Sequence, residues 1–249
     1  MSNSDSWKYV DDTTLAEIVT RGGVSGIQVA VDTVEQWSTT NKLQLNADKC
    51  KELTIDFKKT KHQFDAVTVN SKEIERVDSI KLLGVTISNT LQWNNHVSEV
   101  IKKANKRMYF LTLLKRANVP SHDISCFYRT CIRPVLEYCA LLYHHALPDY
   151  LSKDIERIQR RALAIITPGL HYDESLSLYN IDSLENRRLD QCKLFFESIV
   201  NNPNHKLHKL LPPRNNCKYN LRNSHKFSNR VMRTKRSSTT FIPAMSKHY

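Results

Sequence analysis

The stretch WKYVDDTTL, residues 7–15, places two aspartates side by side between residues that favour β-strands. Residues 7–10 and 13–19 are rich in aromatic and β-branched side chains, and Asp11-Asp12 is a turn-favouring pair. This pattern predicts a β-hairpin with two carboxylates at its tip. Adjacent carboxylates repel each other unless water or a cation screens them. The pair is therefore either a solvated turn or part of a metal site.

The composition predicts a globular protein without a membrane segment. The chain has 249 residues, of which 40% are hydrophobic, and eight are prolines. No run approaches the ~20 apolar residues that cross a bilayer, and the polar residues 1–5 lack the apolar core of a secretory signal. The six cysteines form no C-x-x-C pair. We expect reduced, mostly buried thiols rather than a disulfide framework.

The positive charge is concentrated at the C-terminal end. The whole chain carries a net charge of +12. Residues 198–249 hold 11 of the 37 Lys and Arg residues and no Asp or Glu, so residues 1–197 have a net charge of only +1. A neutral body with a cationic tail indicates a polyanionic partner, most often nucleic acid. The alternative is a solvated, partly disordered tail without a partner.

The first 92 residues predict an α+β layer. Three glycines at 22–26 mark a loop, and the periodicity of residues 24–41 predicts an amphipathic helix. Alternation over 50–57 predicts a strand, and 66–77 a hairpin turning at Asn70-Ser71. Residues 79–88 predict one more strand, interrupted by Gly84.

From Trp93 the apolar residues recur every three or four positions, which predicts a helical bundle over 93–200. A second helix is expected to open with Ser121 as its N-cap, and a third to run over about 151–167. A fourth is expected to begin at Asp182, whose carboxylate can cap it. Residues 201–249 predict loops and a loosely folded tail.

Four stretches occur in a characteristic order: YVDD (9–12), WSTTNKLQLNADKCKELTI (37–55), IKLLGVTIS (80–88) and DIERIQRRALAII (154–166). Together they resemble the reverse transcriptases of non-LTR (LINE-type) retrotransposons, from the C-terminal part of the palm through the thumb. The resemblance covers roughly residues 7–200. It implies a partial polymerase palm of antiparallel hairpins over 1–92, an all-helical, thumb-like region over 93–200 and a basic C-terminal tail over 201–249.

The resemblance implies a two-metal nucleotidyl-transfer site. In the family the YVDD turn holds Mg²⁺ (or Mn²⁺), with Asp11 as the firmer ligand and Asp12 supporting it, and carboxylates are the ligands that these hard cations prefer. Lys49 matches a lysine near the leaving pyrophosphate, where it could protonate or neutralise that group. Leu83 and Gly84 match the primer grip. Each has a plainer alternative: a solvated turn, an exposed lysine and a packing glycine.

The basic residues are candidates for holding an RNA template and DNA primer as an RNA–DNA duplex, through salt-dependent contacts with its backbone. For any single lysine, an ordinary solvated helix face is the simpler reading. In the tail, five basic residues fall every fourth position, with Tyr219 and Phe227 interleaved as candidates to stack on unpaired bases. Because these charges repel, a helix would form there only against an anion. The candidates are Lys102, Lys103, Lys106, Arg107, Arg157, Arg160 and Arg161, and in the tail Arg214, Lys218, Arg222, Lys226 and Arg230.

The family carries its fingers, its dNTP pocket and its first catalytic aspartate ahead of the YVDD turn, and here few residues precede Tyr9. We therefore expect a fragment that is inactive alone, binds Mg²⁺ weakly and uses dNTP only if the upstream part is supplied. The alternative is a non-catalytic remnant that binds RNA or RNA–DNA duplex, and a third option is a copy without a role. The family implies the nucleus, although RTKR (233–236) is too short to support it. Adjacent His144-His145 and the pair Cys217 and His225 lack the spacing of a zinc site.

Overall fold

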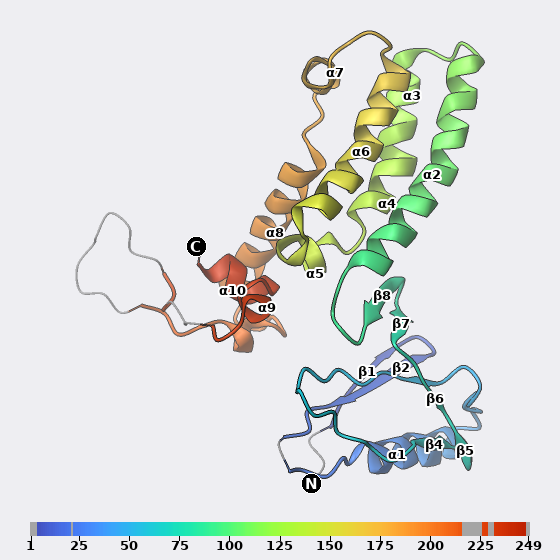
Figure 1. The fold of residues 1–249 in the computed structure, drawn as a ribbon, viewed down its shortest axis with the longest axis vertical. Coiled ribbons are helices and arrows are strands. Elements are labelled where there is room, and N and C mark those ends of the chain that lie inside the picture. Colours follow the sequence, from blue (N-terminus) through green and yellow to red (C-terminus); the bar gives the residue numbers. More distant parts are fainter. Residues whose placement is uncertain (1–3, 21, 216–225, 229–231, 248–249) are drawn as a thin grey trace. The chain divides into compact units, whose positions relative to one another are not determined.

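The computed structural model describes residues 4–20, 22–215, 226–228 and 232–247. These residues form helices and small two-stranded sheets, in agreement with the predicted α+β class (Figure 1). The chain divides into two compact units, Met1–Gln92 and Trp93–Tyr249. The first unit holds all the strands and one helix of the described residues, and the second holds the remaining helices.

The predicted N-terminal hairpin is present. Strands β1 (Ser4–Tyr9) and β2 (Asp12–Glu17) pair antiparallel, and Tyr9 lies opposite Asp12. The two-residue loop is therefore Val10-Asp11, one residue earlier than expected, and Asp12 is the first residue of β2. Val10 has φ +57°, a left-handed conformation that is unusual for a β-branched residue.

Helix α1 (Ile27–Thr40) packs on the hairpin. Its start is positioned by Glu17 of β2, whose carboxylate accepts a hydrogen bond of 2.9 Å from the backbone N–H of Gly26. A negative charge there is favourable because the first N–H groups of a helix are unpaired. The ammonium of Lys8 lies 4.4 Å from the ring centroid of Trp37, so the other strand also contacts α1.

The remaining strands of the first unit are short. Strands β4 (Thr68–Val69) and β5 (Lys72–Glu73) form the predicted hairpin, with both turn residues, Asn70 and Ser71, at positive φ. Two positive φ values in a two-residue loop are typical of a type I′ turn. Gln28 of α1 holds this hairpin by donating to the carbonyl of Thr68 and accepting from its N–H.

Two strand predictions are wrong in this unit. Over 50–57 only β3 (Lys51–Glu52) forms a ladder, and it pairs in parallel with β6 (Glu75–Arg76). Residues 79–88 are not the one interrupted strand that their pattern predicts but a hairpin, as the primer-grip resemblance implies, formed by β7 (Ser79–Leu82) and β8 (Val85–Ser88). The four sheets of the described residues have two strands each.

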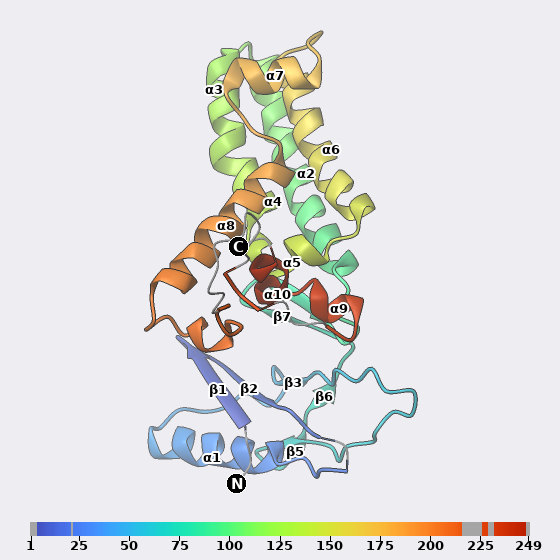
Figure 2. The ribbon, with the colours of Figure 1, turned by 90° about the vertical axis from the view of Figure 1, so that its left-hand side faces the viewer.

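The second unit is a helical bundle around one large core (Figures 1 and 2). Its main helices bury a stripe at helical spacing, so that Ala104, Leu111, Ile155 and Ala162 are 0% exposed. The elements are α2 (Asn94–Arg116), α3 (Ser121–Phe127), a π-helical turn (Tyr128–Ile132), α4 (Arg133–Glu137), α5 (Ala140–Tyr143), α6 (Asp149–Ile166), α7 (Tyr172–Tyr179), α8 (Leu184–Asn201), α9 (Lys235–Ser238) and α10 (Phe241–Ser246), with 3₁₀ turns at His144–Ala146 and His208–Leu210.

Two predicted helix caps are wrong. Ser121 is the first helical residue of α3, and its hydroxyl donates to the carbonyl of Ile166 instead of capping. Helix α8 is capped by Ser183, whose hydroxyl accepts from the N–H of Asn186 at 3.2 Å. Asp182 therefore lies outside the helix. Both errors are shifts of one residue at helix starts, where sequence signals are least specific.

Helices α2 and α6 run parallel to each other, as both ribbon views show (Figures 1 and 2). Asn94 donates to the hydroxyl of Tyr150 at 2.6 Å, and eleven residues further along each helix, Arg161 donates to Asn105 at 3.1 Å. Both pairs are 56 residues apart in the sequence, so the register between the two helices is constant.

Part of the tail, which belongs to the second unit, packs against helix α8. Phe227 is 2% exposed, and its ring lies 6.0 Å from that of Phe196 on α8. Arg214 and Phe227 form an antiparallel bridge, and the N–H of Asn215 donates to the carbonyl of Lys226. Arg214 and Lys226 are not helical, and the helix expected there only against an anion stays a prediction. Phe227 is buried rather than free to stack on a base, so its predicted stacking role is wrong.

The described cysteines are all free thiols, but only Cys192 is buried and Cys126 is exposed, so the expected burial is wrong for most of them. Among the described residues, no helix has the length and apolar character needed to traverse a membrane.

Candidate functional site

The two aspartates lie at the exposed tip of the β1–β2 hairpin. Asp11 is in the loop and Asp12 begins β2, so the pair lies at the turn and not within a straight strand. Both residues are exposed. Within the described residues, neither carboxylate accepts a hydrogen bond or forms an ion pair, so their oxygens are available to a ligand. Tyr9, opposite Asp12, is 64% exposed.

These two carboxylates fit part of a Mg²⁺ or Mn²⁺ site. Hard divalent cations take oxygen ligands and retain several waters, which suits exposed carboxylates. A full site needs further ligands. In the described part of the chain, no group of three or more His, Cys, Asp or Glu residues is placed to hold a metal ion. Asp11 and Asp12 thus offer two carboxylates, and their role as metal ligands remains a prediction.

Lys49 lies in a tight turn that precedes β3. The side-chain oxygen of Asn46 accepts from the N–H groups of Asp48 and Lys49 at 3.1 Å and 3.3 Å, an Asx turn that fixes the backbone. The Lys49 side chain is exposed, and within the described residues no hydrogen bond or ion pair links it to Asp11 or Asp12. Its neighbour Asp48 forms an ion pair with Lys72, which lowers the pKa of the Asp48 carboxyl.

Leu83 and Gly84 form the loop of the β7–β8 hairpin, with φ values of +45° and +85°. Positive φ at both positions indicates a type I′ turn, which favours glycine because it lacks a Cβ. Leu83 is 45% exposed. This hairpin and β1–β2 belong to separate sheets, so the structure does not join the predicted primer grip and the aspartates in one sheet.

The predicted basic surface of α2 is present and solvent-exposed. Lys102, Lys103 and Lys106 are exposed, and within the described residues they have no hydrogen bond or ion pair. Arg107, on the same helix, donates to the carbonyl of Cys131. We call Lys102, Lys103, Lys106 and Arg107 the α2 basic stripe.

The predicted arginines of α6 each make a contact within the fold. Arg157 pairs with Asp154 at 3.1 Å, and Arg161 donates to Asn105. The guanidinium of Arg160 lies 4.3 Å from the ring centroid of Tyr172. These contacts hold the charges at defined positions, but they do not remove them from solvent, because all three arginines are exposed.

The predicted tail residues are only partly described. Arg214 and Lys226 lie on adjacent antiparallel segments. Arg214 forms the bridge with Phe227, and Lys226 lies one residue before Phe227. Lys218, Arg222, Arg230 and the aromatic candidate Tyr219 lie outside the described residues.

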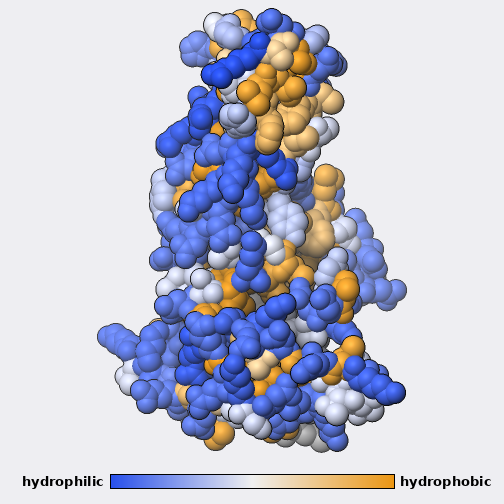
Figure 3. Space-filling model, turned by 90° about the vertical axis from the view of Figure 1, so that its right-hand side faces the viewer, coloured by the Kyte–Doolittle hydropathy of each residue, from blue (hydrophilic) through white to orange (hydrophobic). Residues whose placement is uncertain are grey.

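Tyr109 and Phe110 were not among the predicted binding residues, although both are exposed aromatics on α2, at 61% and 55%. Their rings contact each other edge to face, with centroids 5.6 Å apart. The sequence did contain the signal, since both fall outside the buried stripe that contains Met108 and Leu111. Figure 3, which looks onto α2, shows hydrophilic side chains over most of this face and a patch of hydrophobic ones at the upper end of the bundle in this view.

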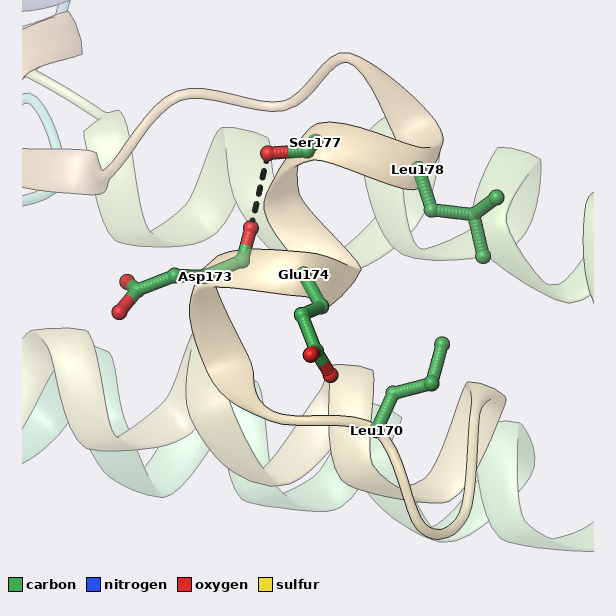
Figure 4. Close-up of a pocket in the computed structure, with 5 residues that line it drawn as sticks. All are labelled: Leu170, Asp173, Glu174, Ser177 and Leu178. Carbon is green, nitrogen blue, oxygen red and sulfur yellow. Dashed lines mark hydrogen bonds between the residues drawn. The ribbon is translucent and has the colours of Figure 1, made fainter.

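A groove of about 420 Å³ lies beside Tyr109, between α2 and α6. A second hollow, of about 660 Å³, lies on α7 and its preceding loop (Figure 4). There Leu170 and Leu178 extend to the same side, with Glu174 between them, and the carboxylate of Glu174 accepts from the N–H of His171 at 2.9 Å. None of the predicted site residues lines the α7 hollow.

A buried polar network fixes α6 against its neighbours. The Tyr128 hydroxyl donates to Gln159 at 2.5 Å, and the Gln159 amide donates to the Tyr172 hydroxyl at 2.8 Å and to the carbonyl of Asp182 at 3.0 Å. Tyr172 also donates to Glu156. Burial, followed by this bond to Glu156, raises the pKa of Tyr172. The network keeps α6, and so its exposed arginines, in a single orientation.

Two curated proteins are similar to most of the chain. It is 22% identical over 237 residues to a Drosophila melanogaster protein named RNA-directed DNA polymerase from mobile element jockey, covering 87% of this chain and 25% of that protein. It is 22% identical over 183 residues to the Drosophila funebris protein of the same name, covering 72% of this chain and 20% of that protein. The chain thus spans about a quarter or less of the length of these relatives.

A family described as Alkylated DNA repair protein alkB homolog 8, N-terminal, matches residues 93–133, which cover α2, α3 and the π-helical turn. No solved structure matches the chain. The distant similarity to the jockey polymerases supports a relationship to retrotransposon reverse transcriptases, as the four sequence motifs indicate.

Proposed function

We propose that this chain is a segment of a non-LTR retrotransposon reverse transcriptase, an RNA-directed DNA polymerase, and that it comprises the C-terminal part of the palm and the thumb. The observation that carries the proposal is the similarity over 87% of the chain to a mobile-element RNA-directed DNA polymerase, in a sequence with Asp11-Asp12 at a hairpin tip.

In this proposal Asp11 and Asp12 hold Mg²⁺ or Mn²⁺, which supplies charge stabilisation during nucleotidyl transfer. A further carboxylate comes from another segment of the polymerase. Lys49 neutralises the leaving pyrophosphate, and the β7–β8 turn at Leu83-Gly84 approaches the primer end. The exposed faces of Trp7 and Tyr9, at 55% and 64%, offer aromatic surface on which the rest of a palm can pack.

The second unit holds the nucleic acid. The α2 basic stripe and the exposed arginines of α6 contact the phosphates of an RNA template and DNA primer. Their charges are arranged along helices, so the contacts read the backbone and not the sequence. This role does not depend on catalysis, and binding of RNA or RNA–DNA duplex without turnover is the second candidate function.

Primer extension tests the proposal. The purified chain, alone and with an upstream polymerase segment supplied as a second chain, would be given an RNA template, a DNA primer, dNTP and Mg²⁺, beside the double variant Asp11→Asn/Asp12→Asn and beside Lys49→Gln. Extension that disappears in the double variant supports polymerase activity through these aspartates. Salt-dependent duplex binding without extension, even when the upstream segment is supplied, supports the second candidate. Extension that survives the double variant contradicts the assigned metal role.

A further inference from the structure

We infer that the groove between α2 and α6 binds an unpaired nucleobase of single-stranded nucleic acid, stacked on Tyr109, while the neighbouring basic residues hold the strand's phosphates. This inference rests on the proposed function and assigns it a ligand, single-stranded nucleic acid, distinct from the duplex.

The groove has a built aromatic wall. Tyr109 is 61% exposed, and its ring is held in a T-shaped contact with the ring of Phe110, with the centroids 5.6 Å apart. The other side is formed by Ile165 of α6, at the level that the constant register between the two helices predicts. The full lining is Asn105, Met108, Tyr109, Thr112, Arg161 and Ile165. An aromatic face beside an aliphatic wall suits the flat, apolar face of a base.

The groove also has polar groups for the edge of a base. Arg161 and Asn105 are joined across it by the 3.1 Å hydrogen bond, so they meet a ligand as one fixed unit. Arg161 uses one of its five N–H donors in this bond, and the others can donate to carbonyl oxygens and ring nitrogens of a base. Guanidinium and amide groups are the usual partners of base edges.

Charges border the groove on both helices. Lys106 lies one turn before Tyr109 on α2, and Lys102 lies one turn before Asn105. Both lysines lack an ion pair within the described residues. On α6, Arg157 lies one turn before Arg161. A strand whose base enters the groove therefore has cations available for its adjacent phosphates.

The geometry favours a single strand over a duplex. In a duplex the bases are stacked and paired, and in A-form helices the deep groove excludes side chains. Tyr109 can stack only on a base that is unpaired. Duplex contacts of the same surface would use phosphates alone, and removal of the Tyr109 ring would leave them unchanged.

The test uses the full chain, an oligouridine RNA of about 12 nucleotides that carries one 2-aminopurine, and an RNA–DNA duplex of equal length. Tyr109→Ala is compared with Tyr109→Phe and with Tyr138→Ala, the removal of another exposed aromatic of the second unit, at 48%, which does not line the groove. Fluorescence anisotropy gives the Kd for each ligand, and 2-aminopurine quenching reports stacking directly.

We expect Tyr109→Ala to weaken single-strand binding by about fivefold or more, because base–aromatic stacking contributes at least about that factor. The same variant should lose the 2-aminopurine quenching and bind the duplex unchanged. Tyr109→Phe, which keeps the ring, should retain the affinity and the quenching, and Tyr138→Ala should resemble the wild type.

Two results overturn the inference while the proposed function stands: single-strand affinity and quenching that are equal in wild type and Tyr109→Ala, or wild-type binding to the duplex alone. A wild-type chain that binds neither ligand at low salt overturns the proposed function itself, and the inference with it.

Discussion

The carboxylate of Glu137 accepts hydrogen bonds from Nε and Nη2 of Arg187, at 2.5 Å and 3.2 Å, and so joins the end of α4 to the first turns of α8. The Glu137 side chain is only 10% exposed, and Arg133 lies 3.9 Å from the same carboxylate. The bond to Glu137 raises the pKa of Arg187. A two-bond, mostly buried ion pair of this kind is stronger than a pair on the surface.

Glu137→Gln should lower the free energy of unfolding by about 1–3 kcal/mol, because it keeps the shape but removes the charge that two arginines face. The measurement is urea unfolding followed by circular dichroism. Asp190→Asn is the matched control, since its ion pair with Lys193 is 3.1 Å long but exposed on both sides. The control should lower the free energy of unfolding by no more than about 1 kcal/mol. An equal decrease in the two variants would contradict the structural role of Glu137.

The backbone of Val10 gives a second prediction. A β-branched residue at φ +57° in the hairpin loop is strained by about 1–2 kcal/mol, whereas glycine adopts this conformation without strain. Val10→Gly should therefore stabilise the first unit, by up to about 1 kcal/mol after the extra chain entropy of glycine is counted. Val24→Gly, at a position without positive φ and 95% exposed, serves as the control and should give no gain. Thermal unfolding measures both, and a loss of stability in Val10→Gly would contradict the strained turn.

How far the sequence predicts this fold depends on the range of the interactions. The helices of the second unit were predictable, because a stripe such as Val97, Ala104 and Leu111 repeats over many turns. The tight turn at Asn70-Ser71 was predictable too, since it is a local signal, whereas the alternation of 79–88 hid the turn at Leu83-Gly84. Short strands were not, because the ladder of Lys51–Glu52 depends on a partner more than twenty residues away.

The candidate site was predictable where it is local and not where it depends on packing. Asp11 and Asp12 lie at a hairpin tip because residues next to them form the strands. The burial of Phe227 was not predictable from the sequence. An aromatic residue between basic ones is equally typical of an exposed residue that stacks on bases, and the ring that Phe227 packs against, Phe196, belongs to a helix distant in the sequence. The α2–α6 groove was missed for the same reason, since its two walls are 56 residues apart.

His144 gives a prediction for the dependence of stability on pH. Burial, then the charges of His145 and Arg188, lower the pKa of His144 from 6.5 to about 4. Above pH 6.5 the imidazole is neutral in both the folded and the unfolded chain. Between pH 6.5 and about 4 only the unfolded chain binds the proton, so the free energy of unfolding falls as the pH falls, by up to about 1.4 kcal/mol per pH unit. Below about pH 4 this contribution is constant.

His144→Gln should remove that part of the pH dependence. Urea unfolding of the wild type and the variant at pH 7.5, 5.5 and 4.5 gives the difference between them, in which the titration of other groups cancels. His122→Gln removes an exposed imidazole from the same bundle and is the control. Parallel stability curves for wild type and His144→Gln over this range would show that His144 is not the group that titrates.

The α2 basic stripe predicts how duplex binding responds to salt. Each phosphate contact releases counterions, so log K falls with log salt concentration by about 0.9 per contact for a duplex. Lys102, Lys103 and Lys106 are exposed and unpaired within the described residues, so their charges are available to phosphates. The triple variant Lys102→Gln/Lys103→Gln/Lys106→Gln should therefore bind the RNA–DNA duplex more weakly, with a salt slope smaller by about 2–3.

Lys193→Gln, which removes an exposed but paired lysine of α8, should leave the slope unchanged. Anisotropy titrations from low to moderate salt measure the slopes. An unchanged salt slope in the triple variant would show that the duplex binds at another surface. An equal reduction of the slope by Lys193→Gln would show that the net charge, and not the α2 basic stripe, governs binding.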